Sequence, residues 1–363
     1  MEFYQAPWKL VPNKLVRYPG GREIDRFRGV EPAQDDGRPE AWVGSDTLVC
    51  YAGENSTEGY ARCILPDGTE CFVPEAIQRD PLHVLGKAHV ERVGETLGFL
   101  VKLLDAQRQL GLQTHPTRPY AAKHFDSPFG KEESWYVIGL REDAKEPPYV
   151  LLGFREGNVQ EEFAKGYDAE DISAMEACCH KIPVQVGDVF FIEAGAPHAI
   201  GGGCFVVEVQ EASDITVGAH KLRGPHTPEE EAAHRERLLG CYHYCSRNYE
   251  ENLQHFRIPP KVIREGDWGR ELMLIGPAQT DYFSFTRLEA EKPVELLSTG
   301  AVQIAIVLEG DGTFSWQGGS CPVHKAEEWM IPAGVAGLKL TPGSGGCVVV
   351  LCNPQGAAPA AGT

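Results

Sequence analysis

The chain lacks several features that would assign it to common protein classes. Its 363 residues contain no run of about 18 apolar residues, so we expect no transmembrane helix. Residues 1–14 contain no apolar segment followed by a small-residue cleavage site, so we expect no signal peptide. Basic residues are few, with 34 Lys and Arg against 52 Asp and Glu. The formal charge of −18 therefore argues against nucleic acid or an anionic membrane surface as a partner.

Cysteine pairs with the spacing of a metal or redox motif are also missing. The 11 cysteines are scattered and include no CxxC pair. Cys241 and Cys245 are four residues apart, but no second pair completes a zinc knuckle. We interpret the cysteines as reduced and mostly buried residues of a cytoplasmic protein.

What the sequence has in abundance is turn-forming residues, with 40 Gly and 26 Pro between short apolar runs. This pattern predicts a mainly β protein with few helices. Helices are expected at 81–93, as one or two short helices within 158–179, and after the Thr227-Pro228 capping signal. The tail from residue 353 is expected to fray. The predicted strands are Thr47–Ala52, Phe99–Leu104, Trp135–Leu140, Tyr149–Phe154, Val189–Ile192, Phe205–Val209, Phe283–Leu288, Val302–Leu308, Glu328–Ile331 and Cys347–Cys352.

A faint internal repeat suggests two similar β units. Residues 186–198 and 325–337 both contain an acidic residue, a short apolar strand and a turn with glycine at the same place. We therefore predict two jelly-roll-like β-barrels: residues 1–218, with a helical insertion at about 158–180, and residues 265–363. A helical linker, residues 219–264, separates them.

Three segments of the first unit carry groups suited to chemistry. Gln113 and His115 project from the same face if their segment is a strand, because side chains alternate with a period of two. Glu133 stands at the start of an apolar strand, and His198 follows the turn at residues 195–197. Two imidazoles, one carboxylate and one amide suit a divalent metal such as zinc, or manganese, iron or cobalt.

These segments resemble the type I mannose-6-phosphate isomerases of the cupin superfamily, in the shorter bacterial form. The resemblance extends from about residue 8 to 216 and is carried by three motifs: Gln113-x-His115-Pro116, Gly130-Lys131-x-Glu133-x-Trp135-Tyr136 and Gly195-x-Pro197-His198-Ala199-Ile200-Gly201.

The resemblance implies two cupin-type barrels and one metal ion held by Gln113, His115, Glu133 and His198. It also implies an enzyme that interconverts mannose 6-phosphate and fructose 6-phosphate through an enediol, with Lys131 facing the substrate. The second unit has Gly337 where a cupin histidine would stand, so we expect no metal ligands there. The expected partner is a small sugar phosphate, and a homodimer is a further expectation.

One departure from the family pattern affects the predicted chemistry. After Ser213-Asp214-x-Thr216 the bacterial enzymes usually have an arginine two residues further on, where this chain has Gly218. Arg223, Lys221 and His220 lie nearby as substitutes, and of these we nominate Arg223 as the catalytic one. As phosphate-binding cations we nominate Arg223, then Arg118 and Lys123. The general base stays open among His220, Lys123, His124 and a metal-bound hydroxide.

Two alternatives follow from the missing arginine. In the first, the chain is a cupin with different chemistry, such as an isomerase of an unphosphorylated sugar or a metal-dependent oxygenase. In the second, it is a sugar-sensing or sugar-binding homologue without catalysis that has kept the fold and the metal.

Overall fold

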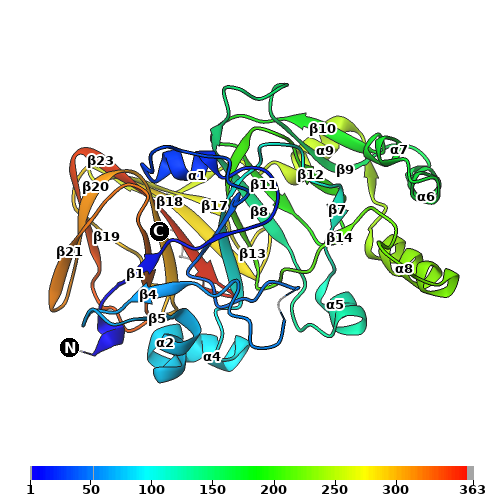
Figure 1. Cartoon of the computed structure of the whole chain (residues 1–363). Helices are drawn as coiled ribbons and strands as arrows, with labels where there is room; N and C mark the ends of the chain where they lie inside the picture. Colours follow the sequence, from blue (N-terminus) through cyan, green and yellow to red (C-terminus); the bar gives the residue numbers. More distant parts are fainter. Residues whose placement is uncertain (1, 52, 358–363) are drawn as a thin grey trace.

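The computed structural model describes residues 2–51 and 53–357 and is mainly β (Figure 1). Its strands form three sheets, which stay open and face each other instead of closing into two separate barrels. The predicted class is therefore confirmed, while the barrels take the form of a layered β-sandwich. No helix in this described part of the chain is long and apolar enough to cross a bilayer. All 11 cysteines are free and 8 are buried.

The central sheet contains six strands and has hydrophobic clusters on both of its faces. On β6, for example, Leu104 packs into one cluster and Leu103 into the other, so the strand is buried along its whole length. Burial on both faces explains why its strands read as continuous apolar runs. In spatial order the strands are β11 (Val189–Ile192), β8 (Glu133–Leu140), β13 (Cys204–Glu211), β6 (Phe99–Asp105), β3 (Glu40–Val43) and β2 (Lys14–Leu15).

A second six-stranded sheet faces one side of the central sheet. The core between them is built around Trp135, Leu152 and Phe190. In this sheet β15 (Ser246–Arg247) pairs with β9 off the main path. The other strands, in spatial order, are β10 (Cys179–Pro183), β9 (Tyr149–Arg155), β12 (His198–Ile200), β7 (Gln113–Thr114) and β14 (Val217–Gly218).

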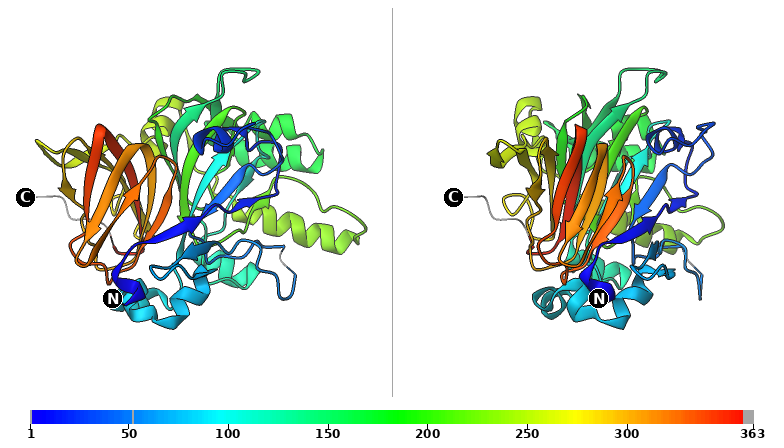
Figure 2. Two further views of the ribbon diagram at one scale, coloured as in Figure 1. Left: turned by 60° about the vertical axis from the view of Figure 1, so that its left-hand side comes forward. Right: turned by 90° about the vertical axis from the view of Figure 1, so that its left-hand side faces the viewer.

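The third sheet has eleven strands and includes every strand from Lys261 to Pro354. The N-terminal strand also belongs to it, because Trp8 pairs with Met330 and Lys9 with Trp329. Figure 2 shows this N-terminal segment in blue beside the orange C-terminal strands. The strands are β16 (Lys261–Gly266), β17 (Gly269–Ile275), β18 (Phe283–Ala290), β23 (Lys339–Pro354), β20 (Gln303–Trp316), β22 (Glu328–Ile331), β1 (Trp8–Val11), β4 (Arg62–Ile64), β5 (Glu70–Phe72), β19 (Val294–Glu295) and β21 (Gly319–Val323).

Helices lie at the periphery and agree with the sequence signals. Thr227 caps α8 and accepts a hydrogen bond from the Glu230 N–H, as its capping pattern predicts. The predicted insertion forms two short helices, α6 and α7. The helices are η1 (Phe3–Gln5), α1 (Arg22–Phe27), α2 (Val73–Arg79), α3 (Pro81–Leu85), α4 (Lys87–Val93), α5 (Arg118–Phe125), α6 (Val159–Asp168), α7 (Ile172–Glu176), α8 (Pro228–Cys241) and α9 (Tyr249–Phe256).

One of the ten predicted strands is wrong. Residues 47–51 form a loop, and residue 52 lies outside the described residues. The Val49 N–H donates to the Glu58 carbonyl and the Cys50 N–H to the Asp214 carboxylate, so this backbone is satisfied without a ladder of strand pairs. At the other end of the chain β23 continues to Pro354, and residues 358–363 of the expected tail lie outside the described residues.

Candidate metal centre and substrate cavity

Four predicted metal ligands converge between the central sheet and the sheet that faces it. In the facing sheet Gln113 of β7 lies directly opposite His198 of β12, and His115 follows the end of β7. Glu133 is the first residue of β8 in the central sheet. The layering of the two sheets therefore brings together residues that are up to 85 positions apart in the chain.

The ligand atoms lie within contact distance of one another. His115 Nε2 is 3.1 Å from His198 Nε2 and 3.1 Å from Glu133 Oε2. His198 Nε2 is 3.4 Å from Glu133 Oε1, and the Gln113 side-chain amide is 3.3 Å from His198 Nε2. Both imidazoles and the carboxylate are about 1% exposed, so solvent does not separate them.

Hydrogen bonds fix which nitrogen of each imidazole faces this cluster. His115 Nδ1 donates to the Ile215 carbonyl at 2.9 Å, and His198 Nδ1 donates to the Ala196 carbonyl at 3.0 Å. Neutral rings protonated at Nδ1 present lone pairs at Nε2. The two Nε2 atoms thus face each other as acceptors, which is the arrangement that a carbonyl bonded to the other ring nitrogen imposes on metal-binding histidines.

The surroundings keep the imidazoles neutral and the carboxylate charged. Burial lowers the pKa of His115 to about 3, and the Lys131 charge adds to this shift. Burial also lowers the pKa of His198. Burial alone would raise the pKa of Glu133, but the Lys131 ammonium 3.4 Å away holds it well below its usual range. These are the protonation states in which the three groups bind a metal ion.

The donor set fits a divalent metal ion. Both carboxylate oxygens of Glu133 are buried and accept no hydrogen bond from residues 2–51 and 53–357. The Lys131 ammonium at 3.4 Å offsets the charge of this carboxylate, but two buried oxygens without a hydrogen bond are costly unless a further group satisfies them. Together with the two imidazole lone pairs, the carboxylate forms a nitrogen and oxygen site of the kind that zinc and related metals occupy.

Two glycines allow the loops around this cluster to close. Gly195 has φ +87° and its N–H donates to the His115 carbonyl at 2.8 Å, which fixes the backbone of that ligand. A Cβ on Gly130 would lie 2.7 Å from the Arg118 backbone nitrogen and 2.8 Å from the Pro116 carbonyl oxygen. Glycine at 130 therefore lets the Lys131 segment pack against the loop that follows His115.

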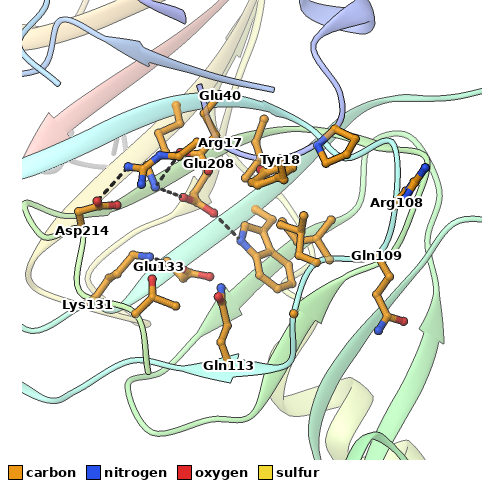
Figure 3. Close-up of a pocket in the computed structure, with 18 of the residues that line it drawn as sticks. Arg17, Tyr18, Glu40, Arg108, Gln109, Gln113, Lys131, Glu133, Glu208 and Asp214 are labelled. Carbon is orange, nitrogen blue, oxygen red and sulfur yellow. Dashed lines mark hydrogen bonds and ion pairs between the residues drawn. The ribbon is translucent and has the colours of Figure 1, made fainter. Parts of the chain in front are cut away.

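A cavity of about 390 Å³ opens beside the cluster, within the size range of small-ligand sites. Figure 3 shows Lys131, Glu133 and Gln113 on one side of it and Arg108 and Gln109 on another. The Lys131 Nζ lies 3.1 Å from His115 Nε2 and 3.4 Å from Glu133 Oε2, so its ammonium borders both the cluster and the cavity. Lys131 therefore lines the cavity, while the substrate-facing role that the family resemblance implies for it stays a prediction.

A buried ion pair, missed in the sequence, forms part of the cavity wall. Lys102 on β6 and Glu208 on β13 are directly opposite each other, and Lys102 Nζ lies 2.9 Å from Glu208 Oε1. The indole N–H of Trp135 donates to the other carboxylate oxygen of Glu208 at 3.0 Å. Burial would lower the pKa of Lys102, but Glu208 and Glu40 raise it above its usual value. The signal in the sequence that could have indicated this pair is a single charged residue inside each of two apolar runs, Lys102 in one and Glu208 in the other.

A second ion pair crosses the cavity wall from the N-terminal segment. The Arg17 guanidinium lies 2.9 Å from the Asp214 carboxylate and 3.8 Å from that of Glu40. It also stacks over the rings of Trp42 and Tyr51. Arg17 is thus committed to neighbouring carboxylates and aromatic faces.

The cations nominated from the sequence lie outside the cavity lining. Arg118 pairs with Glu211 and stacks on Tyr282 at 3.8 Å. Lys123 is exposed on α5, and Arg223 is exposed in the loop before α8. Their assigned roles remain predictions.

Gly218 lies next to the metal cluster. It pairs directly with Gln113, and a Cβ at this position would be 2.9 Å from the ring of His220. The His220 imidazole therefore fills the space in which a side chain at 218 would begin. His220 Nδ1 donates to the Lys221 carbonyl at 2.9 Å, so the Nε2 atom is the ring nitrogen left beside Gly218.

Comparisons with known proteins agree with this architecture. Residues 277–352 match the sequence profile described as "Mannose-6-phosphate isomerase, cupin domain". A Streptococcus mutans mannose-6-phosphate isomerase is 34% identical over 167 residues, which cover 45% of this chain and 50% of the relative. The chain is thus similar to mannose-6-phosphate isomerases, and its residues 277–352 match their cupin domain.

Other relatives extend the similarity over more of the chain. A probable mannose-6-phosphate isomerase of Bacillus subtilis is 26% identical over 250 residues, covering 66% of this chain and 70% of the relative. The crystal structure of the mannose 6-phosphate isomerase from Bacillus subtilis superposes with a TM-score of 0.74 at 18% identity, covering 96% of this chain and 100% of that one. The structure of "a putative mannosephosphate isomerase from Archaeoglobus fulgidus" superposes with a TM-score of 0.75 at 18% identity, covering 98% of this chain and 99% of that one. The structural matches show the shared fold.

Proposed function

We propose that the protein is a metal-dependent aldose–ketose isomerase that interconverts mannose 6-phosphate and fructose 6-phosphate through an enediol. The observation that carries this proposal is the buried convergence of His115, His198 and Glu133 beside a cavity of small-ligand size. The names of the relatives and the shared fold support the choice of substrate.

His115, Glu133 and His198 would hold the metal ion, with Gln113 as the fourth ligand. A half-turn of the Gln113 side-chain amide presents its oxygen in place of its nitrogen. We propose zinc, since two imidazoles and a carboxylate with an open position are typical of catalytic zinc sites. When bound, the ion supplies Lewis-acid stabilisation of the charge that develops on the sugar oxygens.

Residues of the chain perform the other tasks. The Lys131 ammonium is positioned to donate a hydrogen bond to a sugar oxygen next to the metal ligands. The Lys102–Glu208 pair and Trp135 form a preorganised wall that orients the sugar without moving during the reaction. Among the predicted bases, His220 has the best support, because its ring lies beside Gly218, opposite Gln113. Its Nε2 would carry the proton between C2 and C1.

A coupled assay tests this proposal by converting newly formed fructose 6-phosphate into a spectroscopic signal. The metal-loaded protein is expected to isomerise mannose 6-phosphate, and chelation or His115→Ala is expected to abolish the activity. His83→Ala is the matched control, since that imidazole is exposed on α3. A metal-loaded wild-type protein that is inactive on all hexose phosphates would refute the proposal.

The glycine at 218 keeps an unphosphorylated sugar as the second candidate. A glycine there adds no fixed positive charge next to the metal cluster, although His220 occupies the space. The same assay with unphosphorylated mannose, followed by product analysis, distinguishes the candidates. Turnover of mannose at a rate equal to that of its phosphate would favour the second one.

A further inference from the structure

Arg108 differs from the other cations that line the cavity. Lys102 pairs with Glu208, Arg17 with Asp214 and Lys131 with Glu133, so each of these charges is compensated. Arg108 is exposed and has no carboxylate within 4.0 Å among residues 2–51 and 53–357. In Figure 3 it lies away from Lys131 and Glu133. The cavity therefore has one uncompensated positive charge, at a distance from its metal ligands.

The loop that carries Arg108 is held at both ends. The Ala106 N–H donates to the Cys204 carbonyl at 3.0 Å, and the Leu110 N–H donates to the Ile200 carbonyl at 2.9 Å. Between these points the loop packs on Gly202, where a Cβ would lie 3.2 Å from the Arg108 Cα. The backbone beneath the guanidinium is thus fixed by the same strand connection that follows His198. Fixed anchoring reduces the entropy that ligand binding would otherwise cost.

We infer that Arg108 binds the phosphate of the sugar phosphate and so determines specificity for phosphorylated substrate. The inference rests on the proposed function. The phosphate on C6 is at the opposite end of a hexose from C1 and C2, which must reach the metal ligands. A guanidinium presents parallel N–H donors that match phosphate oxygens. In a chain of charge −18, an anion needs such a local cation to enter the cavity.

The compensated cations are poorer candidates for this task. Lys102 and Arg17 would have to leave a carboxylate that is 2.9 Å away before they could bind phosphate. Arg118 is likewise paired with Glu211. Arg108 can bind the anion without breaking an existing ion pair. Gln109, from the same loop, adds a polar side chain to the cavity lining.

Steady-state kinetics of the metal-loaded full chain test the inference. Arg108→Gln is expected to raise KM for mannose 6-phosphate about 10- to 100-fold, as expected for loss of a charge-assisted contact. The value of kcat is expected to change less than about 2-fold, and the inhibition constant of inorganic phosphate should rise in parallel with KM. Arg108→Lys is expected to restore part of the affinity, because the charge returns without the planar fork.

Lys145→Gln is the matched control. Lys145 is exposed and lines a second pocket, beside Arg108 and Tyr149, but does not line the cavity next to the metal ligands. Lys145→Gln therefore removes one positive charge from the same side of the molecule. The KM of the Lys145→Gln variant for mannose 6-phosphate is expected to stay within about 2-fold of the wild-type value, since exposed charges are screened by solvent and salt. An equal rise in KM for Lys145→Gln and Arg108→Gln would overturn the inference, as would an unchanged KM and phosphate inhibition constant in Arg108→Gln.

Direct binding of inorganic phosphate separates this inference from the proposed function. If the wild-type protein isomerises no hexose phosphate, the proposed function fails, and calorimetric titration with inorganic phosphate still tests Arg108. Binding to wild type that Arg108→Gln weakens at least about 10-fold supports the site. Equal binding to both proteins, or no binding to wild type, overturns it.

Discussion

The buried Lys102–Glu208 pair makes a quantitative prediction about the cavity wall. Both side chains are 4% exposed, and their charged atoms are 2.9 Å apart. At an effective dielectric constant of about 20, that distance corresponds to an attraction of about 6 kcal/mol. Lys102→Met leaves the buried Glu208 carboxylate with the Trp135 N–H as its remaining close partner. Breaking such a pair costs about 3–5 kcal/mol of unfolding free energy.

A double-mutant cycle distinguishes the pair from two independent residues. Glu208→Gln removes the charge but keeps an oxygen acceptor, so it is expected to cost about 1–3 kcal/mol. Lys102→Met combined with Glu208→Gln is expected to cost about 2–3 kcal/mol less than the sum of the single changes, because no orphaned charge remains. Lys9→Met is the control, since it breaks an exposed pair with Glu327 and should cost less than about 1 kcal/mol.

Urea unfolding provides the measurement for this cycle. The free energies should be taken from transitions in which tryptophan fluorescence and near-ultraviolet circular dichroism coincide, with unchanged denaturant slopes. The reasoning would be refuted if the loss of unfolding free energy in the double variant equalled the sum of the losses in the two single variants within about 0.5 kcal/mol. A cost for Lys102→Met equal to that of Lys9→Met would also refute it.

Three further changes test other parts of the structure. His198→Ala is expected to abolish stoichiometric zinc binding by the full chain, and a variant that still binds one equivalent would contradict the ligand assignment. Gly195→Ala is expected to destabilise the protein by about 1–3 kcal/mol and to weaken metal binding. The reason is that φ at this position is +87° and a Cβ would lie 2.4 Å from the His243 ring. Calorimetry measures the loss of stability, and metal titration measures the loss of metal affinity. Burial lowers the pKa of His89 below 6.5, so unfolding free energy should fall as pH drops below that value, by at most about 1.4 kcal/mol per pH unit. His89→Gln should lose this slope, and an unchanged slope would refute the assignment.

Local patterns in the sequence were sufficient for much of the fold. The runs that became β6, β8 and β13 are long and apolar, since the central sheet is buried on both faces. The loop at residues 47–51 was mistaken for a strand because its single backbone partners, Glu58 and Asp214, cannot be read from an apolar run. Pairing of the N-terminal strand with Met330 joins residues more than 320 positions apart, and no local pattern encodes that register.

The candidate metal centre was predictable because each ligand has a local signal. Gln113 and His198 end up directly opposite each other, in strands whose turns contain recognisable glycine and proline. The cations were harder to predict, because the role of a lysine or arginine depends on which carboxylates the fold places beside it. Arg118 is a predicted phosphate-binding cation but is paired with Glu211, whereas Arg108, for which the sequence predicts no role, has no carboxylate partner among the residues that the structure describes.

The distribution of charge in the cavity connects the departure at Gly218 with the proposed substrate. Four cations and four carboxylates line the cavity, so the side chains alone give no net attraction for an anion. A divalent ion on the histidine cluster would add two positive charges, and Arg108 places its charge at a distance from them. An arginine at 218 would concentrate positive charge beside Gln113, whereas this chain has the His220 ring in that space. Under the proposed function, phosphate recognition would then depend on Arg108, and His220 would be the candidate for proton transfer.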